Sequence, residues 1–125
     1  MILDTNALSA WAEGQSSIEE HLRSADYLVV PSIVLGEYYF GIRRSRFRQR
    51  YEAWLQANLP HTRIAQVGHA TADVYAKIQE ELRFSGTPIP SNDTWIAALA
   101  RQHRLPLLSN DQHFDCVEGL ERLKF

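Results

Sequence analysis

Short apolar runs alternate along the chain with longer stretches in which apolar residues recur every three or four positions. A short run predicts a buried strand, and the longer spacing predicts one face of a helix. The predicted strands are residues 1–3, 27–30, 64–67, 105–108 and 120–123. The predicted helices are residues 7–13, 17–23, 32–42, 47–58, 71–84 and 94–103. Helices between successive strands indicate parallel connections, so we expect an α/β fold with a central, mainly parallel sheet.

Local signals place several helix ends. Ser17 with Glu20 three positions later forms a capping box, which predicts that the second helix begins there. Ser32 is a candidate N-cap for the third helix, and Gly86 is expected to end the fifth. The pattern leaves open whether the third helix continues through the arginine-rich segment after it or stops and restarts.

Composition narrows the class of protein. The chain has 125 residues, 45% hydrophobic and 22% charged, which is typical of one globular domain over 1–125 and argues against disorder. No apolar stretch reaches the roughly 20 residues of a membrane-spanning helix. The single cysteine, Cys116, excludes an internal disulfide and a cysteine-based zinc site of the usual spacing. Residues 1–4 lack the basic and apolar segments of a signal peptide, so we expect a cytoplasmic protein without membrane contact.

Charge is distributed unevenly. The formal net charge is −2, yet arginines crowd into residues 43–50, Arg-Arg-Ser-Arg-Phe-Arg-Gln-Arg. Such a run can be a solvated helix face, a patch that contacts phosphate, or a protein interface, because arginine binds phosphate and carboxylate equally well. The sequence does not decide among the three.

Four carboxylates are candidates for a common site. Asp4 follows the first strand, Asp111 follows the strand at 105–108, Asp93 begins a helix, and Glu37 lies one turn into the helix after the second strand. In a parallel sheet these positions share one edge, where ligands bind. Clustered carboxylates repel one another, so a divalent cation is their natural partner. An all-oxygen ligand set favours Mg²⁺, with Mn²⁺ as a possible substitute, and suits phosphodiester hydrolysis.

Each carboxylate also has a purely structural interpretation. Asp93 could serve only as an N-cap, and Asp111 could serve only an Asx turn. Glu37 interrupts an apolar stretch, so we expect it to be buried and to need a partner. Asp4 is harder to explain structurally, because residues at strand ends carry function.

Four ordered motifs resemble those of the PIN-domain ribonucleases, and more narrowly the VapC toxins of bacterial toxin–antitoxin pairs. The motifs span essentially the whole chain. They are Leu3-Asp4-Thr5-Asn6, Pro31-Ser32-Ile33-Val34-Leu35-Gly36-Glu37 with Gly41, Asn92-Asp93-Thr94-Trp95-Ile96-Ala97-Ala98, and Leu108-Ser109-Asn110-Asp111-Gln112-His113-Phe114.

The resemblance implies a three-layer α/β/α domain and an Mg²⁺-dependent endoribonuclease that hydrolyses RNA with metal-activated water. It also implies a homodimer that a cognate antitoxin neutralises. Any contact with operator DNA would be made only through that antitoxin. Carried over by position, the catalytic and metal-binding residues are Asp4, Glu37, Asp93 and Asp111, with Asn6 and Ser109 in support. Asp115, four residues past Asp111, is an alternative for the last ligand. His113 is near Asp111 in sequence and could contact the substrate, but we expect a surface histidine.

The aromatic content of the middle helices independently suggests a dimer. They carry more aromatic surface than a small sheet covers, and such excess usually marks an interface. The residues are Tyr38, Tyr39, Phe40, Phe47, Tyr51 and Trp54.

Two other functions fit the sequence less well. A phosphoacceptor signalling domain is also small, α/β and Mg²⁺-binding, but it needs an acidic pair after the first strand, a mid-chain aspartate and a late lysine. Here Thr5 follows Asp4, residues 58–60 hold no aspartate, and Lys77 and Lys124 are the only lysines. A PIN-like domain that binds nucleic acid or a protein partner without catalysis is the remaining alternative, and the complete set of carboxylates argues against it.

Overall fold

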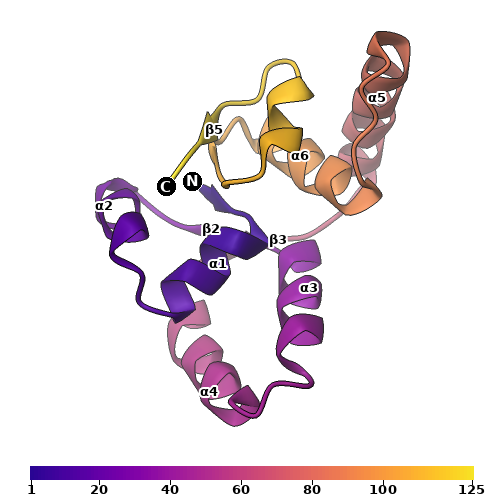
Figure 1. The fold of residues 1–125 in the computed structure, drawn as a ribbon. Helices are drawn as coiled ribbons and strands as arrows, with labels where there is room; N and C mark the ends of the chain where they lie inside the picture. Colours follow the sequence, from indigo (N-terminus) through magenta and orange to yellow (C-terminus); the bar gives the residue numbers. More distant parts are fainter.

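The central sheet holds five strands, and every neighbouring pair is parallel (Figure 1). The computed structural model describes residues 1–125. The strands lie in the order β3-β2-β1-β4-β5. Their bounds are β1 Ile2–Leu3, β2 Val29–Pro31, β3 Arg63–Ala65, β4 Leu107–Leu108 and β5 Arg122–Leu123. Each overlaps a predicted apolar run but is shorter, and the predicted α/β class is confirmed.

The chain crosses the sheet in two directions. It runs outward from β1 to β2 and β3, then returns to place β4 beside β1. Since parallel crossovers are right-handed, this reversal puts the helices on two faces. Figure 1 shows α1 to α4 on one side of the sheet, and α5 and α6 on the other. The helices are α1 Thr5–Ala12, α2 Ser16–Ser24, α3 Ser32–Ile42, α4 Arg48–Asn58, α5 His69–Ser85 and α6 Ser91–His103, with the 3₁₀ turns η1 Leu59–His61 and η2 Gln112–Cys116.

Helix ends differ from several predictions. The capping box at Ser17 is wrong, because α2 already begins one residue earlier, with Gln15 at the N-cap and no side-chain cap. Prolines fill the N-cap positions of α3 and α6, so Ser32 and the segment from Ser91 are inside their helices. Proline's fixed φ and missing N–H suit such a boundary. Gly86 ends α5 at φ 70°, as predicted.

The arginine-rich segment separates two helices. After α3 ends at Ile42, a turn follows in which the Ser45 amide donates to the Ile42 carbonyl, 3.0 Å away. The Ser45 hydroxyl in turn accepts from the Phe47 amide at 3.1 Å. A serine side chain that bonds nearby backbone competes with the helical ladder. The helix therefore restarts at Arg48 instead of continuing.

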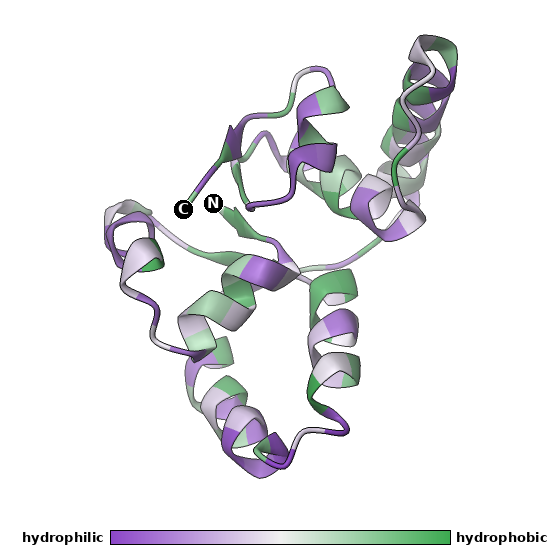
Figure 2. Cartoon of the chain, in the orientation of Figure 1, coloured by the Kyte–Doolittle hydropathy of each residue, from purple (hydrophilic) through white to green (hydrophobic).

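The core lies on both faces of the sheet. Both residues of β1 and both of β4 are fully buried, as expected for a parallel sheet covered by helices. Residues 96–100 of α6 are buried all round, which fixes this helix firmly in the core. Figure 2 shows β1 as hydrophobic and the helices as mixed, whereas the edge strand β5 carries hydrophilic residues. None of the helices is long and apolar enough to cross a membrane.

The aromatic residues of the middle helices divide into two groups. Tyr38 is buried, and Trp54 packs edge-on against Trp11 with ring centroids 4.9 Å apart, so these rings cover the chain's own core. The expectation that they form excess surface is wrong for this group. The second group, Tyr39, Phe40 and Phe47, is exposed, and Phe40 is the most exposed of the three at 81%. For these residues the dimer interface stays a prediction.

Candidate active site

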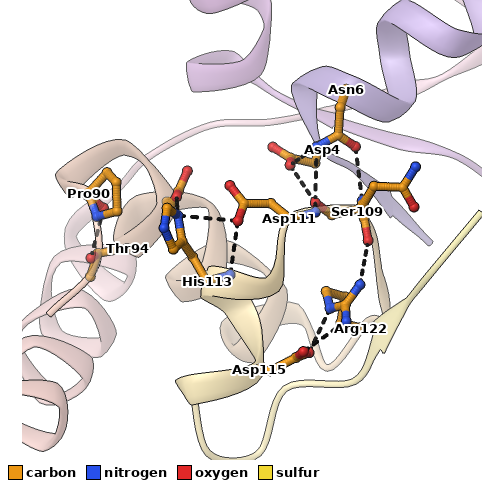
Figure 3. Close-up of polar contacts among 11 residues, drawn as sticks. Asp4, Asn6, Pro90, Thr94, Ser109, Asp111, His113, Asp115 and Arg122 are labelled. Atoms are coloured by element: carbon orange, nitrogen blue, oxygen red, sulfur yellow. Dashed lines mark hydrogen bonds and ion pairs between the residues drawn. The ribbon is translucent and has the colours of Figure 1, made fainter. Parts of the chain in front are cut away.

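Asp4 and Ser109 lie close together at the point where the order of strands across the sheet reverses. Leu3 pairs with Leu108, so Asp4 and Ser109 leave neighbouring strands at the same edge. Such a switch point between parallel strands is where α/β proteins bind ligands. The buried Ser109 hydroxyl donates to Asp4 Oδ2 at 2.6 Å (Figure 3). A hydrogen bond therefore joins positions 105 residues apart in the chain.

Asn6 completes the support of Asp4. Its Nδ2 donates to Asp4 Oδ2 at 2.9 Å and to the Ser109 hydroxyl at 3.2 Å. The Asn110 amide donates to Asn6 Oδ1 at 3.2 Å, which holds the Asn6 side chain in place. Asp4 occupies the N-cap position of α1, yet its carboxylate forms no side-chain cap. The carboxylate is instead fixed between two side chains.

Glu37 reaches the same edge from α3. Its Oε1 accepts a hydrogen bond from the Thr5 hydroxyl at 3.2 Å. The prediction that Glu37 is buried is wrong: it is half-buried, because α3 turns Gly36, Tyr39 and Phe40 toward solvent beside it. A pocket of about 270 Å³ opens next to Glu37 between α1, α3 and α4. The carboxylate thus borders open space.

Asp93 and Asp111 adjoin each other through His113. Asp93 lies in the first turn of α6, where its negative charge interacts favourably with the helix dipole. The N-cap of this helix is Pro90, so the prediction that Asp93 is only an N-cap is wrong. Asp111 does form the predicted local turn, since its Oδ1 accepts from the His113 amide at 2.9 Å. Its own amide donates to the Ser109 hydroxyl at 3.0 Å, which ties this turn to the Asp4 network.

His113 is a surface residue, as the sequence predicts, and it lies beside two of the carboxylates. Its Nδ1 lies 3.1 Å from Asp93 Oδ2 and 3.2 Å from Asp111 Oδ1 (Figure 3). The side chain is about half exposed, so it is on the surface as expected, but it faces the carboxylates. The available signal was its place two residues after Asp111, where an Asx turn directs the chain back toward the aspartate.

Asp115 does not join the carboxylates. It forms a two-pronged ion pair with Arg122, at 2.6 and 2.8 Å, and Arg122 also donates to the Ser109 carbonyl at 3.0 Å. Figure 3 shows this pair on the far side of the turn from His113. The pair lowers the pKa of Asp115. Asp115 therefore braces the β4–β5 connection.

The remaining carboxylates form a cluster of unneutralised negative charge. Burial raises the pKa of Asp4, as do nearby Asp93 and Glu37, while the Ser109 hydrogen bond opposes the shift. Burial and Asp111 likewise raise the pKa of Asp93 against the effect of His113. None of the four carboxylates pairs with an arginine or lysine. Oxygen ligands and uncompensated charge are what a hard divalent cation requires.

Comparison with known proteins places these features in context. The family model described as PIN domain matches residues 1–120. Ribonuclease VapC2 of Haemophilus influenzae is 33% identical over 99 residues, which cover 78% of this chain and 75% of that protein.

Solved structures share the fold. The DNA-bound VapBC structure from Salmonella typhimurium matches with a TM-score of 0.87 at 23% identity, covering 98% of this chain and 96% of that one. VapBC2 from Rickettsia felis, bound to a DNA fragment from its promoter, matches with a TM-score of 0.86, also at 23% identity and over 98% and 96% of the two chains.

Proposed function

The chain belongs to the PIN-domain family, among the relatives of the VapC ribonucleases, and from this premise we propose that it is the endoribonuclease toxin of a toxin–antitoxin pair. One observation carries the proposal for this particular chain. Asp4 is held by Ser109 and Asn6 in a carboxylate cluster that no arginine or lysine neutralises. A purely structural cluster has no reason to keep such repulsion in a folded protein.

The residues divide the work of the site. Asp4 and Asp93, with Glu37 and Asp111, hold Mg²⁺ or Mn²⁺ as oxygen ligands. The bound cation supplies the positive charge that acidifies water and stabilises the transition state of phosphodiester hydrolysis. Asn6 and Ser109 fix the Asp4 carboxylate, and Thr5 orients Glu37 at the edge of the pocket.

The partners follow from the relatives. The proteins from Salmonella typhimurium and Rickettsia felis were solved as VapBC complexes on DNA. These complexes support a separately encoded antitoxin as the neutralising partner, with operator DNA contacted through the antitoxin. We propose RNA as the substrate, because the relative from Haemophilus influenzae is named a ribonuclease. We also propose a homodimer, whose surface includes the exposed aromatic residues.

RNA cleavage with and without metal tests the activity. The parent is expected to cleave RNA in millimolar Mg²⁺ and to stop in EDTA. Asp4→Asn, purified identically, should be inactive in both, which also excludes a contaminating nuclease. Asp73→Asn changes an exposed carboxylate on α5 and should remain active.

Two results would contradict the proposal. RNA cleavage that persists in EDTA, or that the Asp4→Asn variant retains, would contradict the proposal of a metal-dependent site at Asp4. RNA binding without any cleavage in Mg²⁺ would favour a domain that only binds.

A further inference from the structure

Three potential ligand atoms converge beside the carboxylate cluster. One oxygen each from Asp93 and Asp111 and one ring nitrogen from His113 lie within 4.8 Å of one another. The three side chains come from α6, the N-cap of η2 and η2 itself. Two separate chain segments are thus needed to build this group.

Hydrogen bonding alone accounts poorly for the His113 ring. Nδ1 faces two carboxylate oxygens at nearly equal distances, 3.1 and 3.2 Å. A ring nitrogen carries at most one proton, so it cannot make a full hydrogen bond to each. Two oxygens and one nitrogen around a common point are instead an ordinary set of metal ligands.

Backbone contacts hold His113 in this place. The His113 amide donates to Asp111 Oδ1, and the Asp111 amide donates to the Ser109 hydroxyl, which also binds Asp4. The backbone of His113 is therefore linked through Asp111 and Ser109 to Asp4. Its side chain is 53% exposed, so a cation can reach it from solvent without unfolding.

We propose that His113 is a ligand of the divalent cation together with Asp93 and Asp111, and that its nitrogen makes the site prefer Mn²⁺ to Mg²⁺. The inference rests on the proposed function, because it requires a cation among the carboxylates. Mg²⁺ strongly prefers oxygen ligands, whereas the first-row transition metals bind imidazole readily. A nitrogen in the ligand set therefore shifts selectivity.

Pulsed electron paramagnetic resonance of the Mn²⁺-loaded protein, without RNA, tests the assignment directly. The parent is expected to show echo modulation from a directly bound ¹⁴N nucleus. His113→Gln keeps an oxygen ligand and should lose this modulation while still binding Mn²⁺. His61→Gln, which replaces an exposed histidine before β3, should leave it unchanged.

Competition between the two cations gives a second measurement. The Mn²⁺ affinity of His113→Gln should fall by roughly tenfold or more, because losing only a partner behind a metal ligand typically costs about 10–100-fold. Its Mg²⁺ affinity should change less, so the Mn²⁺ to Mg²⁺ preference narrows. A thermal melt of His113→Gln in EDTA checks that the variant is folded.

The outcomes separate the two proposals. Mn²⁺ that binds the parent without ¹⁴N modulation would overturn the role of His113 and leave the ribonuclease proposal standing. An unchanged cation preference in folded His113→Gln would also overturn it. A parent that binds Mg²⁺ but no Mn²⁺ would overturn the role of His113 alone, whereas a parent that binds neither cation would overturn both proposals.

Discussion

Ser109 illustrates how single residues build this site. Its fully buried hydroxyl donates to Asp4 and accepts from the Asn6 side chain and the Asp111 amide. One side chain thus connects residues from both sides of the sheet's reversal. A buried hydroxyl with its hydrogen bonds satisfied is rigid, and rigidity is what a metal ligand such as Asp4 requires.

Replacing Asp93 with asparagine should separate stability from activity. Asp93→Asn removes a charge that burial and Asp111 disfavour, while its amide oxygen can still accept from His113. In EDTA the variant should melt no lower than the parent. Millimolar Mg²⁺ should raise the melting temperature of the parent more than that of the variant, since a ligand of the native state stabilises the fold more when it binds more tightly. RNA cleavage should fall by orders of magnitude. Equal stabilisation of both proteins by Mg²⁺, with cleavage retained, would contradict a metal-binding role for Asp93.

The raised pKa values of Asp4 and Asp93 predict an unusual pH dependence for the metal-free protein. The folded state holds these two protons to a higher pH than the unfolded state does, so their contribution to stability falls as pH rises through the raised values. In EDTA, the melting temperature of the parent, relative to that of Asp4→Asn/Asp93→Asn, should therefore rise as the pH falls from 7 toward the ordinary aspartate pKa of 3.8. Saturating Mg²⁺ should weaken or reverse the trend, because the cation competes with protons. Identical pH profiles for the parent and the double variant in EDTA would rule out this linkage.

Elements differ in how well the sequence predicts them. The apolar runs at 1–3 and 105–108 locate β1 and β4, because burial on both faces leaves a continuous hydrophobic signature. The N-caps of α3 and α6 are Pro31 and Pro90 instead of the polar residues that the sequence predicts, since serine is a stronger N-cap signal than proline. The contact of His113 with Asp93 cannot be predicted from the sequence, because it joins segments that only the folded sheet edge brings together.

The connection between α3 and α4 places positive charge on the surface. Arg43, Arg44 and Arg46 are exposed, whereas Arg48 pairs with Glu52 at 2.6 Å inside α4. Arg43, Arg44 and Arg46 are therefore accessible to a binding partner, whereas Arg48 forms an ion pair within its own helix.

Substituting these three arginines should weaken RNA binding. Arg43→Gln/Arg44→Gln/Arg46→Gln, measured in the Asp93→Asn background, is expected to flatten the salt dependence by roughly one unit of slope per lost phosphate contact. Arg83→Gln on α5 is the control for a general loss of positive charge. A defect only in antitoxin binding would identify a protein interface, and no defect in either assay would leave a solvated surface.

The whole molecule exposes aromatic surface on two separate helices. Phe40 on α3 is 81% exposed and Phe84 on α5 is 95% exposed, although most other large apolar side chains are covered. Large exposed rings of this kind are enriched at interfaces between subunits.

Light scattering should therefore find a dimer for the parent without antitoxin, and Phe40→Asp should shift it toward the monomer. Val67→Asp adds the same charge at an exposed apolar residue between β3 and α5, outside the aromatic surface, and should leave the dimer intact. Thermal melting would show that both variants are folded. A parent that is monomeric at tens of micromolar would contradict the dimer.

The bond between Ser109 and Asp4 has a consequence for synthesis. A ribosome makes Ser109 only 105 positions after Asp4. Until then β1 lacks its neighbour β4, and closing so long a loop is slow. A nascent chain therefore cannot assemble the site while β4 is still unmade. If the site cleaves RNA as proposed, cleavage can begin only after Ser109 has left the ribosome.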